Sequence, residues 1–187
     1  TVLVQGAGAV GLAAAAFAGL RGAGQVILIG APAARLGLGT TLGADLTLSL
    51  DSTQAAERRA LVAERTRGRG SDVVIEASGN PRALTEGFDL LRDGGTYVIA
   101  GHYTDAGPID INPHLDVNRK HADIRGQWGT DFHHVARALY MLAKHRDRLP
   151  FASVIGGRYP LEAAGKALAD VAELRVTKAV IDPRLSR

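Results

Sequence analysis

The chain has 187 residues, of which 46% are hydrophobic and 22% are charged, and these proportions are ordinary for a soluble globular domain. Its formal net charge of +3 is too small to indicate a nucleic-acid partner, and the absence of cysteine excludes disulfides and thiolate metal sites. There is no apolar run of about 18 residues and no signal peptide, so we expect a cytoplasmic protein without a membrane partner.

Short apolar runs alternate with helical patterns along the whole chain. The predicted strands are Val2–Gln5, Gln25–Gly30, Asp45–Leu50, Asp72–Ala77, Thr96–Ala100, His121–Gly126 and Val176–Ile181. The predicted helices are Ala9–Arg21, Pro32–Leu42, Thr53–Thr66, Pro81–Leu91, Asp131–His145 and Leu161–Leu174, and His102–Pro113 is a predicted loop. Because repeated strand–helix units imply right-handed crossovers, the order predicts an α/β fold of the Rossmann type. We expect a doubly wound, parallel, six-stranded sheet with helices on both faces.

Gly6, Gly8 and Gly11 lie in the turn between the first predicted strand and the first helix. In such a turn the first glycine permits the tight bend, the second leaves room for a ligand, and the third lets helix and strand pack closely. The helix N-terminus then directs backbone N–H groups at a pyrophosphate. We therefore predict a dinucleotide site that includes Gly6, Gly8, Ala9, Val10 and Gly11. The alternatives are a turn that binds nothing and one that binds a methyl donor.

The first residue indicates that the chain is part of something longer. Thr1 directly precedes the first predicted strand, and a native protein rarely starts inside its first core strand. We therefore expect an excised or processed part of a larger protein.

The combined spacing of the motifs resembles the cofactor-binding half of the medium-chain, zinc-dependent alcohol dehydrogenases. The matching segments are Val2–Gly11, Arg35-Leu36, Leu42–Asp45, Asp72–Gly79 and Gly94–Thr96. The resemblance implies an NAD(P)-binding Rossmann domain at residues 1–150. It also implies a return segment at residues 151–187, which would pack on a catalytic domain that is absent from this chain and that carries the zinc ligands.

The resemblance implies ligand contacts at the carboxyl ends of the predicted strands. The glycine turn would cradle the pyrophosphate, and Gly30 and Arg35 would lie near the adenosine ribose. The loop Ala77, Ser78 and Gly79 would lie against the adenosine and its ribose. The groups that would hold or face the nicotinamide end are those of Ala100, Gly101, His102, Gln127 and Trp128.

The choice between NAD and NADP stays open in the sequence. A carboxylate about 20 residues past the glycine turn normally binds the ribose 2′-hydroxyl and selects NAD. Here Gly30 is followed by Ala31 and Pro32, so that acidic residue is missing. Arg35 is suited either to bind a 2′-phosphate bidentately or to stack near the adenine. We favour NAD and do not exclude NADP.

The histidines do not predict a metal site or a catalytic residue in this chain. His133 and His134 are adjacent on a predicted helix and point about 100° apart. His102 is the exception of interest, because it would face the nicotinamide. Its role there is either catalytic or structural. Trp128, the only tryptophan, is expected either in the core or lining a pocket or subunit interface.

The resemblance implies an oxidoreductase that transfers a hydride between a small-molecule alcohol, a secondary alcohol or polyol, and NAD(P), with zinc assistance in the full-length protein. This chain alone is expected to be inactive. The alternatives are a zinc-free relative such as a quinone reductase, a stand-alone nucleotide-binding module and a methyltransferase. The resemblance also implies a homodimer formed near residues 121–129. The basic run Arg65, Arg67 and Arg69 is interpreted as a solvated helix end, not a nucleic-acid site.

Overall fold

A computed structural model of the chain describes residues 1–185. Its main sheet has six strands in the order β3-β2-β1-β4-β5-β6, and every neighbouring pair is parallel. The strands are β1 (Val2–Gln5), β2 (Val26–Gly30), β3 (Leu46–Ser49), β4 (Ser71–Glu76), β5 (Leu91–Ile99) and β6 (Asp123–Gly126). This is the predicted Rossmann topology, and the strand order reverses between β1 and β4.

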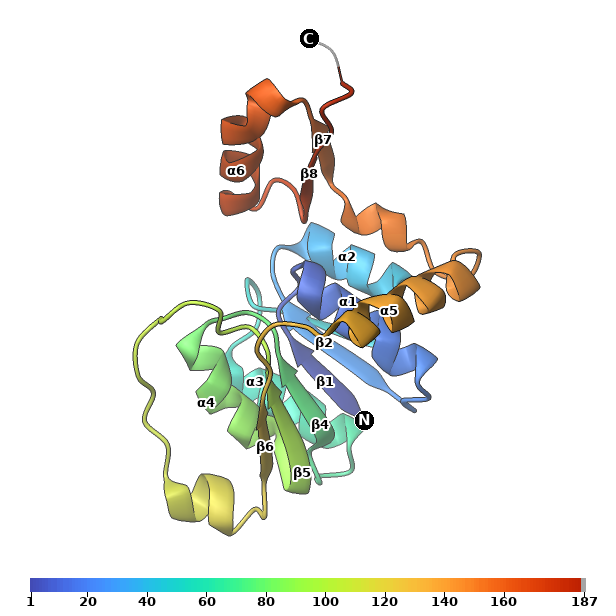
Figure 1. Cartoon of the computed structure of the whole chain (residues 1–187). Coiled ribbons are helices and arrows are strands. Elements are labelled where there is room, and N and C mark those ends of the chain that lie inside the picture. The colour runs from blue at the N-terminus through green and yellow to red at the C-terminus, as the bar shows by residue number, and fades with distance from the viewer. Residues whose placement is uncertain (186–187) are drawn as a thin grey trace.

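Helices cover both faces of this sheet, as the sequence predicts (Figure 1). They are α1 (Ala9–Leu20), α2 (Ala33–Thr41), α3 (Ala55–Arg65) and α4 (Pro81–Leu90), whereas α5 (Phe132–His145) contributes no residue to the core clusters. Successive strand residues face opposite sides, so Leu3 packs in one core cluster and Val4 in the other. One cluster includes side chains of α3 and α4, and the other includes side chains of α1 and α2. All five residues of β2 are buried, which is typical of a parallel strand covered on both faces.

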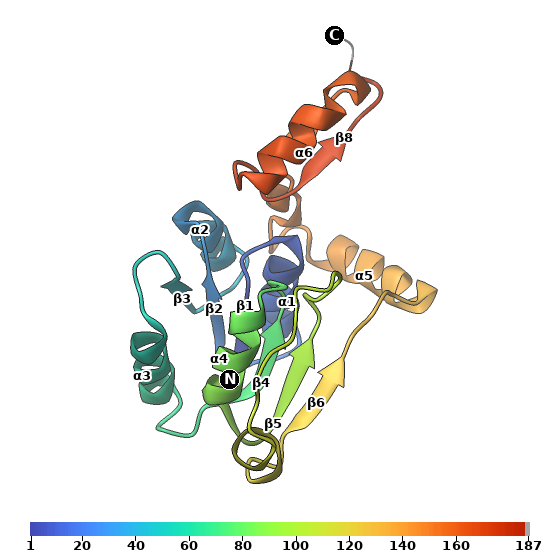
Figure 2. The same ribbon diagram turned by 90° about the vertical axis from the view of Figure 1, so that its left-hand side faces the viewer.

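A small C-terminal unit lies beyond the carboxyl ends of the strands (Figures 1 and 2). It contains η2 (Phe151–Val154), β7 (Gly157–Tyr159), η3 (Leu161–Ala163), α6 (Ala164–Ala172) and β8 (Ala179–Ile181), and β7 pairs with β8 in parallel. The ring of Phe151 stacks on Phe17 of α1, with 5.9 Å between centroids. The boundary near residue 150 and the docking of this unit on another domain stay predictions.

The start of one predicted strand is wrong, and two further local features were not predicted. β7 was not predicted, because three residues are too few to show a strand period. The last strand begins at Ala179 and not at Val176. The stretch after the predicted loop forms a π-helical turn, η1 (Pro113–Asn118), which Asn112 caps by accepting hydrogen bonds from the amides of His114 and Leu115.

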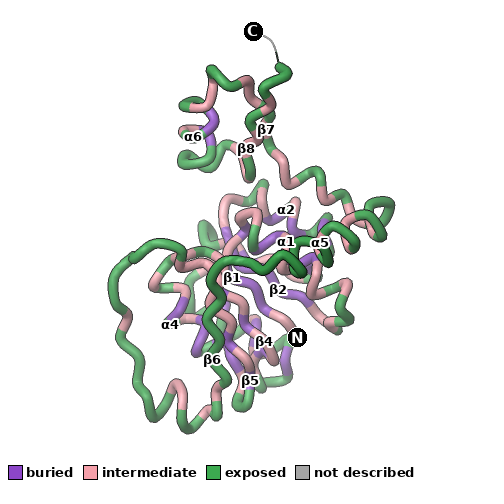
Figure 3. The backbone as a smooth tube through the Cα atoms, viewed as in Figure 1, coloured by how far each residue is buried: buried purple, intermediate pink, exposed green. Residues whose placement is uncertain are grey.

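The sixth strand and the helix after it are the least covered parts of the main domain. Every residue of β6 is exposed, and α5 contains no buried residue (Figure 3). The side chain of Phe132, at the start of α5, is 84% exposed. No helix within residues 1–185 is long and apolar enough to cross a membrane.

Candidate functional site

The glycine turn lies at the switch point of the sheet, and two of its glycines are fixed by packing. Gly6 has a φ of 114°, and a Cβ there would lie 2.9 Å from the carbonyl of Ala77. A Cβ at Gly11 would overlap the carbonyl oxygen of Gly6. Both positions therefore require glycine, because the turn is pressed against the end of β4 and against α1.

Gly8 differs, because a Cβ there would have no atom within 4 Å. It is the N-cap of α1, and no side chain of the described residues caps this helix end. The first turn of α1 contains no acidic residue, so its amides and its dipole offer an uncompensated positive potential. Open space together with an uncapped N-terminus fits the pyrophosphate of a dinucleotide.

Glu76, at the end of β4, holds two of the predicted binding loops together. Its carboxylate is fully buried, and Oε1 accepts hydrogen bonds from the amides of Ser78 at 2.6 Å and Gly79 at 2.8 Å. The Ser78 hydroxyl donates to the same oxygen at 2.7 Å, and the Gly101 amide donates to Oε2 at 3.2 Å. One carboxylate thus ties the loop after β4 to the loop after β5.

These two loops meet backbone to backbone. Gly79 has a φ of 70°, and a Cβ there would lie 2.8 Å from the carbonyl oxygen of Gly101. A Cβ at Gly101 would collide with the amide nitrogen of Gly79. The structure therefore brings Ala77, Ser78 and Gly79 next to Ala100 and Gly101, as the predicted site requires.

His102 follows directly and lies against the same carboxylate. Its Nε2 is 3.6 Å from Oε2 of Glu76 and is buried without a hydrogen-bond partner in residues 1–185. The imidazole is thus within reach of the buried charge that organises both loops. This contact gives His102 a structural position and leaves its predicted place at the nicotinamide end untested.

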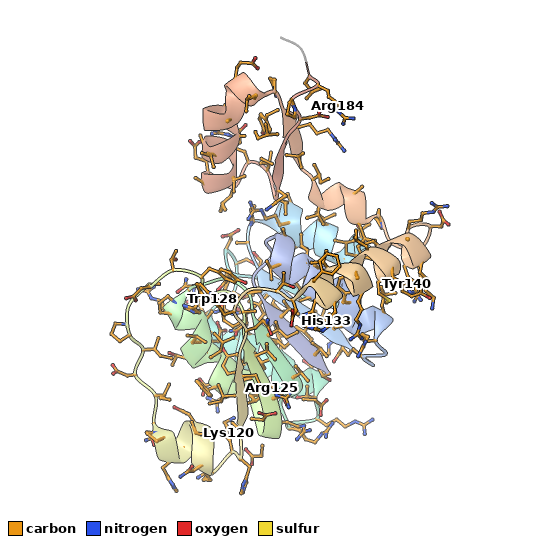
Figure 4. The ribbon with its side chains drawn as sticks, viewed as in Figure 1. Lys120, Arg125, Trp128, His133, Tyr140 and Arg184 are labelled. Carbon is orange, nitrogen blue, oxygen red and sulfur yellow. The ribbon has the colours of Figure 1, made fainter. Side chains whose placement is uncertain are left out.

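Gln127 and Trp128 extend from the end of β6. The amide of Gln127 donates to the carbonyl of Ile99 at 2.9 Å, which continues the pairing of β5 with β6. Trp128 is 74% exposed, which removes the core as one of its two expected places, and its role in lining a pocket or interface stays a prediction (Figure 4). Its ring stacks on Tyr103 with 4.8 Å between centroids, and the Tyr103 hydroxyl accepts from the Gly129 amide. This aromatic pair stands at the same edge of the sheet as the glycine turn.

Gly30 and Arg35 belong to the other side of the switch point. A Cβ at Gly30 would lie 2.6 Å from the Cβ of Ala7, so this glycine lets β2 pass close to the glycine turn. The Nη2 of Arg35 donates to the carbonyl of Val176 at 2.7 Å, and Nε is buried without a partner in the described chain. Burial lowers the pKa of the Arg35 guanidinium from its ordinary value. Arg35 thus connects α2 to the C-terminal unit.

Sequence reasoning missed Glu76 as an organising residue. A signal was available, because Glu76 is the single charged residue within the apolar run Val73–Ala77. A carboxylate at the end of a buried strand needs donors, and the amides of the loop that follows are the nearest source. Within residues 1–185, no group of three or more histidine, aspartate or glutamate side chains could hold a metal ion.

The fold and the turn geometry define a Rossmann domain with the glycine turn typical of dinucleotide-binding proteins. The chain belongs to the zinc-binding dehydrogenase family, whose sequence model matches residues 9–144. The family inferred from the motifs is therefore confirmed, and this membership decides against a methyltransferase.

Individual relatives match over nearly the whole chain. The 5-exo-hydroxycamphor dehydrogenase of Pseudomonas putida is 39% identical over 185 residues, which are 99% of this chain and 51% of that protein. The crystal structure of an alcohol dehydrogenase from Thermotoga maritima is 35% identical, with a TM-score of 0.90 over 95% of this chain and 48% of that one. A zinc-binding dehydrogenase from Sinorhizobium meliloti, bound to NADP, is 26% identical with a TM-score of 0.78 over 90% of this chain and 48% of its own. The chain thus spans about half the length of these relatives.

Proposed function

We propose that this chain is the NAD(P)-binding part of a dehydrogenase that transfers a hydride between a small alcohol and the cofactor. The observation that carries the proposal is the open, uncapped glycine turn at the switch point of the sheet. The relatives named as alcohol and hydroxycamphor dehydrogenases support an alcohol as the substrate. Secondary alcohols and polyols are the classes that we favour.

In this proposal the residues of the chain bind the dinucleotide and orient its nicotinamide ring. The first amides of α1 and the space at Gly8 would receive the pyrophosphate, and the loop at Ser78 and Gly79 would bind the adenosine. Ala100, Gly101 and Gln127 would hold the nicotinamide carboxamide through their backbone carbonyls, because their amides already donate to Glu76 and Ile99. When bound, the nicotinamide supplies a hydride acceptor at its C4 atom. Glu76 keeps the two loops in one geometry, which would help them to orient the nicotinamide ring.

The described residues do not supply a ligand set for the zinc that the family name implies, so no step of the chemistry assigned to this chain runs through the metal. We propose that zinc ligands and most of the substrate pocket belong to the remaining half of the full-length protein. The 187-residue chain alone is then expected to produce no NAD(P)H from alcohols.

We favour NAD over NADP. Arg35 is the residue that the sequence offers for a 2′-phosphate, and its Nη2 already donates a hydrogen bond to the carbonyl of Val176 in the C-terminal unit. The relative bound to NADP makes NADP the competing outcome. If Arg35 reads a 2′-phosphate, Arg35→Ala will weaken binding of NADP more than binding of NAD, whereas equal effects would remove that role.

A single substitution tests the proposed site without disturbing the fold. Gly8→Asp places a carboxylate in open space at the N-cap, where Asp is a preferred residue. We expect the variant to unfold at the same or slightly higher temperature, since an N-cap Asp adds a few tenths of a kcal/mol over Gly. Binding of NAD and NADP in calorimetric titrations should fall by roughly 100-fold, because the new charge repels the pyrophosphate.

Gly8→Asn is the matched control for this experiment, because it adds a similar side chain without the charge. It should bind dinucleotides better than Gly8→Asp does. Unchanged dinucleotide affinity in Gly8→Asp would place the ligand elsewhere, and tight binding of S-adenosylmethionine by the wild type would reject the proposed cofactor class.

A further inference from the structure

A cavity of about 680 Å³ opens at the amino ends of β4, β5 and β6, at the sheet edge opposite to the glycine turn. In Figures 1 and 2 this edge is the lower one, where η1 lies. Its walls come from α3, the turn before β4, the start of β5 and the turn before β6. The volume is in the range of ordinary small-molecule sites. Nothing in the proposed dehydrogenase chemistry uses this cavity.

Five cationic side chains line this cavity, namely Arg59, Arg69, Arg92, Arg119 and Lys120. Two carboxylates, of Asp89 and Asp93, also line it, so positive charge is in excess by three. The whole chain has a net charge of +3, and this one cavity therefore concentrates an excess equal to that of the entire molecule. The basic run that the sequence suggested to be a solvated helix end contributes Arg69 to it.

Two of the five cations have structural partners. Arg92 Nε lies 2.6 Å from Oδ1 of Asp72, and Lys120 Nζ donates to the carbonyl of Leu91 at 2.6 Å. The side chains of Arg59, Arg69 and Arg119 form no hydrogen bond or ion pair within residues 1–185. These three guanidinium groups come from three separate segments around one cavity, and their donors are free for a ligand.

Buried residues form the base of the cavity, and a backbone hydrogen bond connects two of its walls. Val62, Leu90 and Leu91 beneath it are each about 1% exposed. The Gly94 amide donates to the carbonyl of Lys120 at 2.6 Å, which ties the turn before β6 to the start of β5. The backbone around the cavity is therefore held in place, and binding has to order only the exposed side chains of Arg59, Arg69 and Arg119.

We propose that this cavity binds a small molecule that carries two or more phosphate groups. A guanidinium presents paired donors that match phosphate oxygens, and arginines on separate segments suit an extended polyphosphate better than a single small anion. The cavity volume leaves room for an organic group attached to the phosphates. The site is independent of the proposed cofactor site, since it lies at the other edge of the sheet.

Titration calorimetry with inorganic tripolyphosphate and with ATP, at about 0.15 M salt, tests the proposal. The wild-type chain should bind tripolyphosphate, and the triple variant Arg59→Ala/Arg69→Ala/Arg119→Ala should bind it at least tenfold more weakly. The matched control is Arg65→Ala/Arg137→Ala/Arg146→Ala, which removes the same charge outside the cavity and should change affinity less than about twofold. Tighter binding of ATP than of tripolyphosphate would show that the organic group also contributes.

The proposed cofactor site also attracts phosphates, so Gly8→Asp is titrated in parallel. Its affinity for tripolyphosphate should match that of the wild type. The proposal is overturned by loss of binding in Gly8→Asp alone, by equal losses in both triple variants, by full binding in the cavity variant, or by no wild-type binding at millimolar tripolyphosphate. Circular dichroism and melting temperatures check that each variant is folded.

Discussion

At the scale of single residues, the site depends on one buried carboxylate more than on the glycines that mark it in the sequence. Glu76 accepts hydrogen bonds from four donors on two loops, and Oε2 also lies near His102. Such a charge is tolerated in a buried position because its oxygens are satisfied. The loops after β4 and β5 are therefore held in fixed positions relative to each other before any ligand binds.

Replacing this carboxylate by an amide tests the argument. In Glu76→Gln one oxygen becomes an NH₂ group, which cannot accept the amide hydrogen bonds of Ser78, Gly79 or Gly101. We expect a loss of about 1–3 kcal/mol in the free energy of unfolding, together with weaker dinucleotide binding. Urea unfolding measures the first effect and titration calorimetry the second. Glu64→Gln, on the exposed face of α3, is the control and should be neutral; a neutral Glu76→Gln would remove the organising role.

At the same scale, the sequence predicted the glycines but not their supporting contacts. Gly6 and Gly11 were identified because the spacing of the turn has a known physical meaning. The pairing of Gly79 with Gly101 was not predicted, because it joins residues 22 positions apart that meet only once β4 and β5 are adjacent. The exposure of Trp128 depends in the same way on how little covers β6.

At the scale of elements, Asp170 holds the C-terminal unit together. Its Oδ2 accepts hydrogen bonds from the Tyr159 hydroxyl on β7 at 2.7 Å and from Lys166 at 2.6 Å. Its Oδ1 accepts from Arg175 at 2.6 Å, on the segment that leads to β8. Lys166 first, then Tyr159 and Arg175, hold the pKa of this carboxyl well below its ordinary value. One side chain thus joins α6 to β7 and to the segment that precedes β8.

This cluster makes the C-terminal unit sensitive to acid. Because the folded pKa of Asp170 is depressed, its stabilising contribution is present above the unfolded value of about 3.9 and is lost as the pH falls through the folded pKa. Hydrogen exchange should show the amides of β7 and β8 losing protection below about pH 4. Asp170→Asn should lower that protection already at pH 7. Asp147→Asn, whose side chain is 94% exposed, should not; equal protection in both variants at pH 7 would contradict the argument.

Elements whose residues show a clear hydrophobic period were predicted well, whereas elements that depend on pairing with a distant strand were not. α1, β2 and β4 show apolar runs or glycine signals, so local sequence was sufficient. β7 exists because it pairs with β8, a partner 22 residues later. The start of β5 at Leu91 likewise depends on pairing with Ser71 across an irregular register. Pairing between residues far apart in the sequence produces no local hydrophobic period from which a strand could be predicted.

At the scale of the whole molecule, one edge and one helix lack the cover that the rest of the sheet has. β6 is the last strand of the sheet and is exposed throughout, and α5 buries none of its apolar side chains Val135, Leu139 and Leu142. An edge strand with unpaired backbone groups is an aggregation risk unless something covers it. A second copy of the chain would cover this edge strand through a symmetric contact.

We therefore expect a homodimer formed through residues 121–129. Ile124 lies in the middle of β6, and lysine there would bury an unpaired ammonium at the contact, which should weaken the dimer by roughly 100-fold or more. Leu50→Lys is the matched control, because Leu50 is a half-exposed leucine that directly follows β3, the strand at the opposite edge of the sheet. Sedimentation equilibrium should show a dimer for the wild type and the control, and a monomer for Ile124→Lys. A monomeric wild type at high concentration, or a dimer that survives Ile124→Lys, would place the partner of this edge elsewhere.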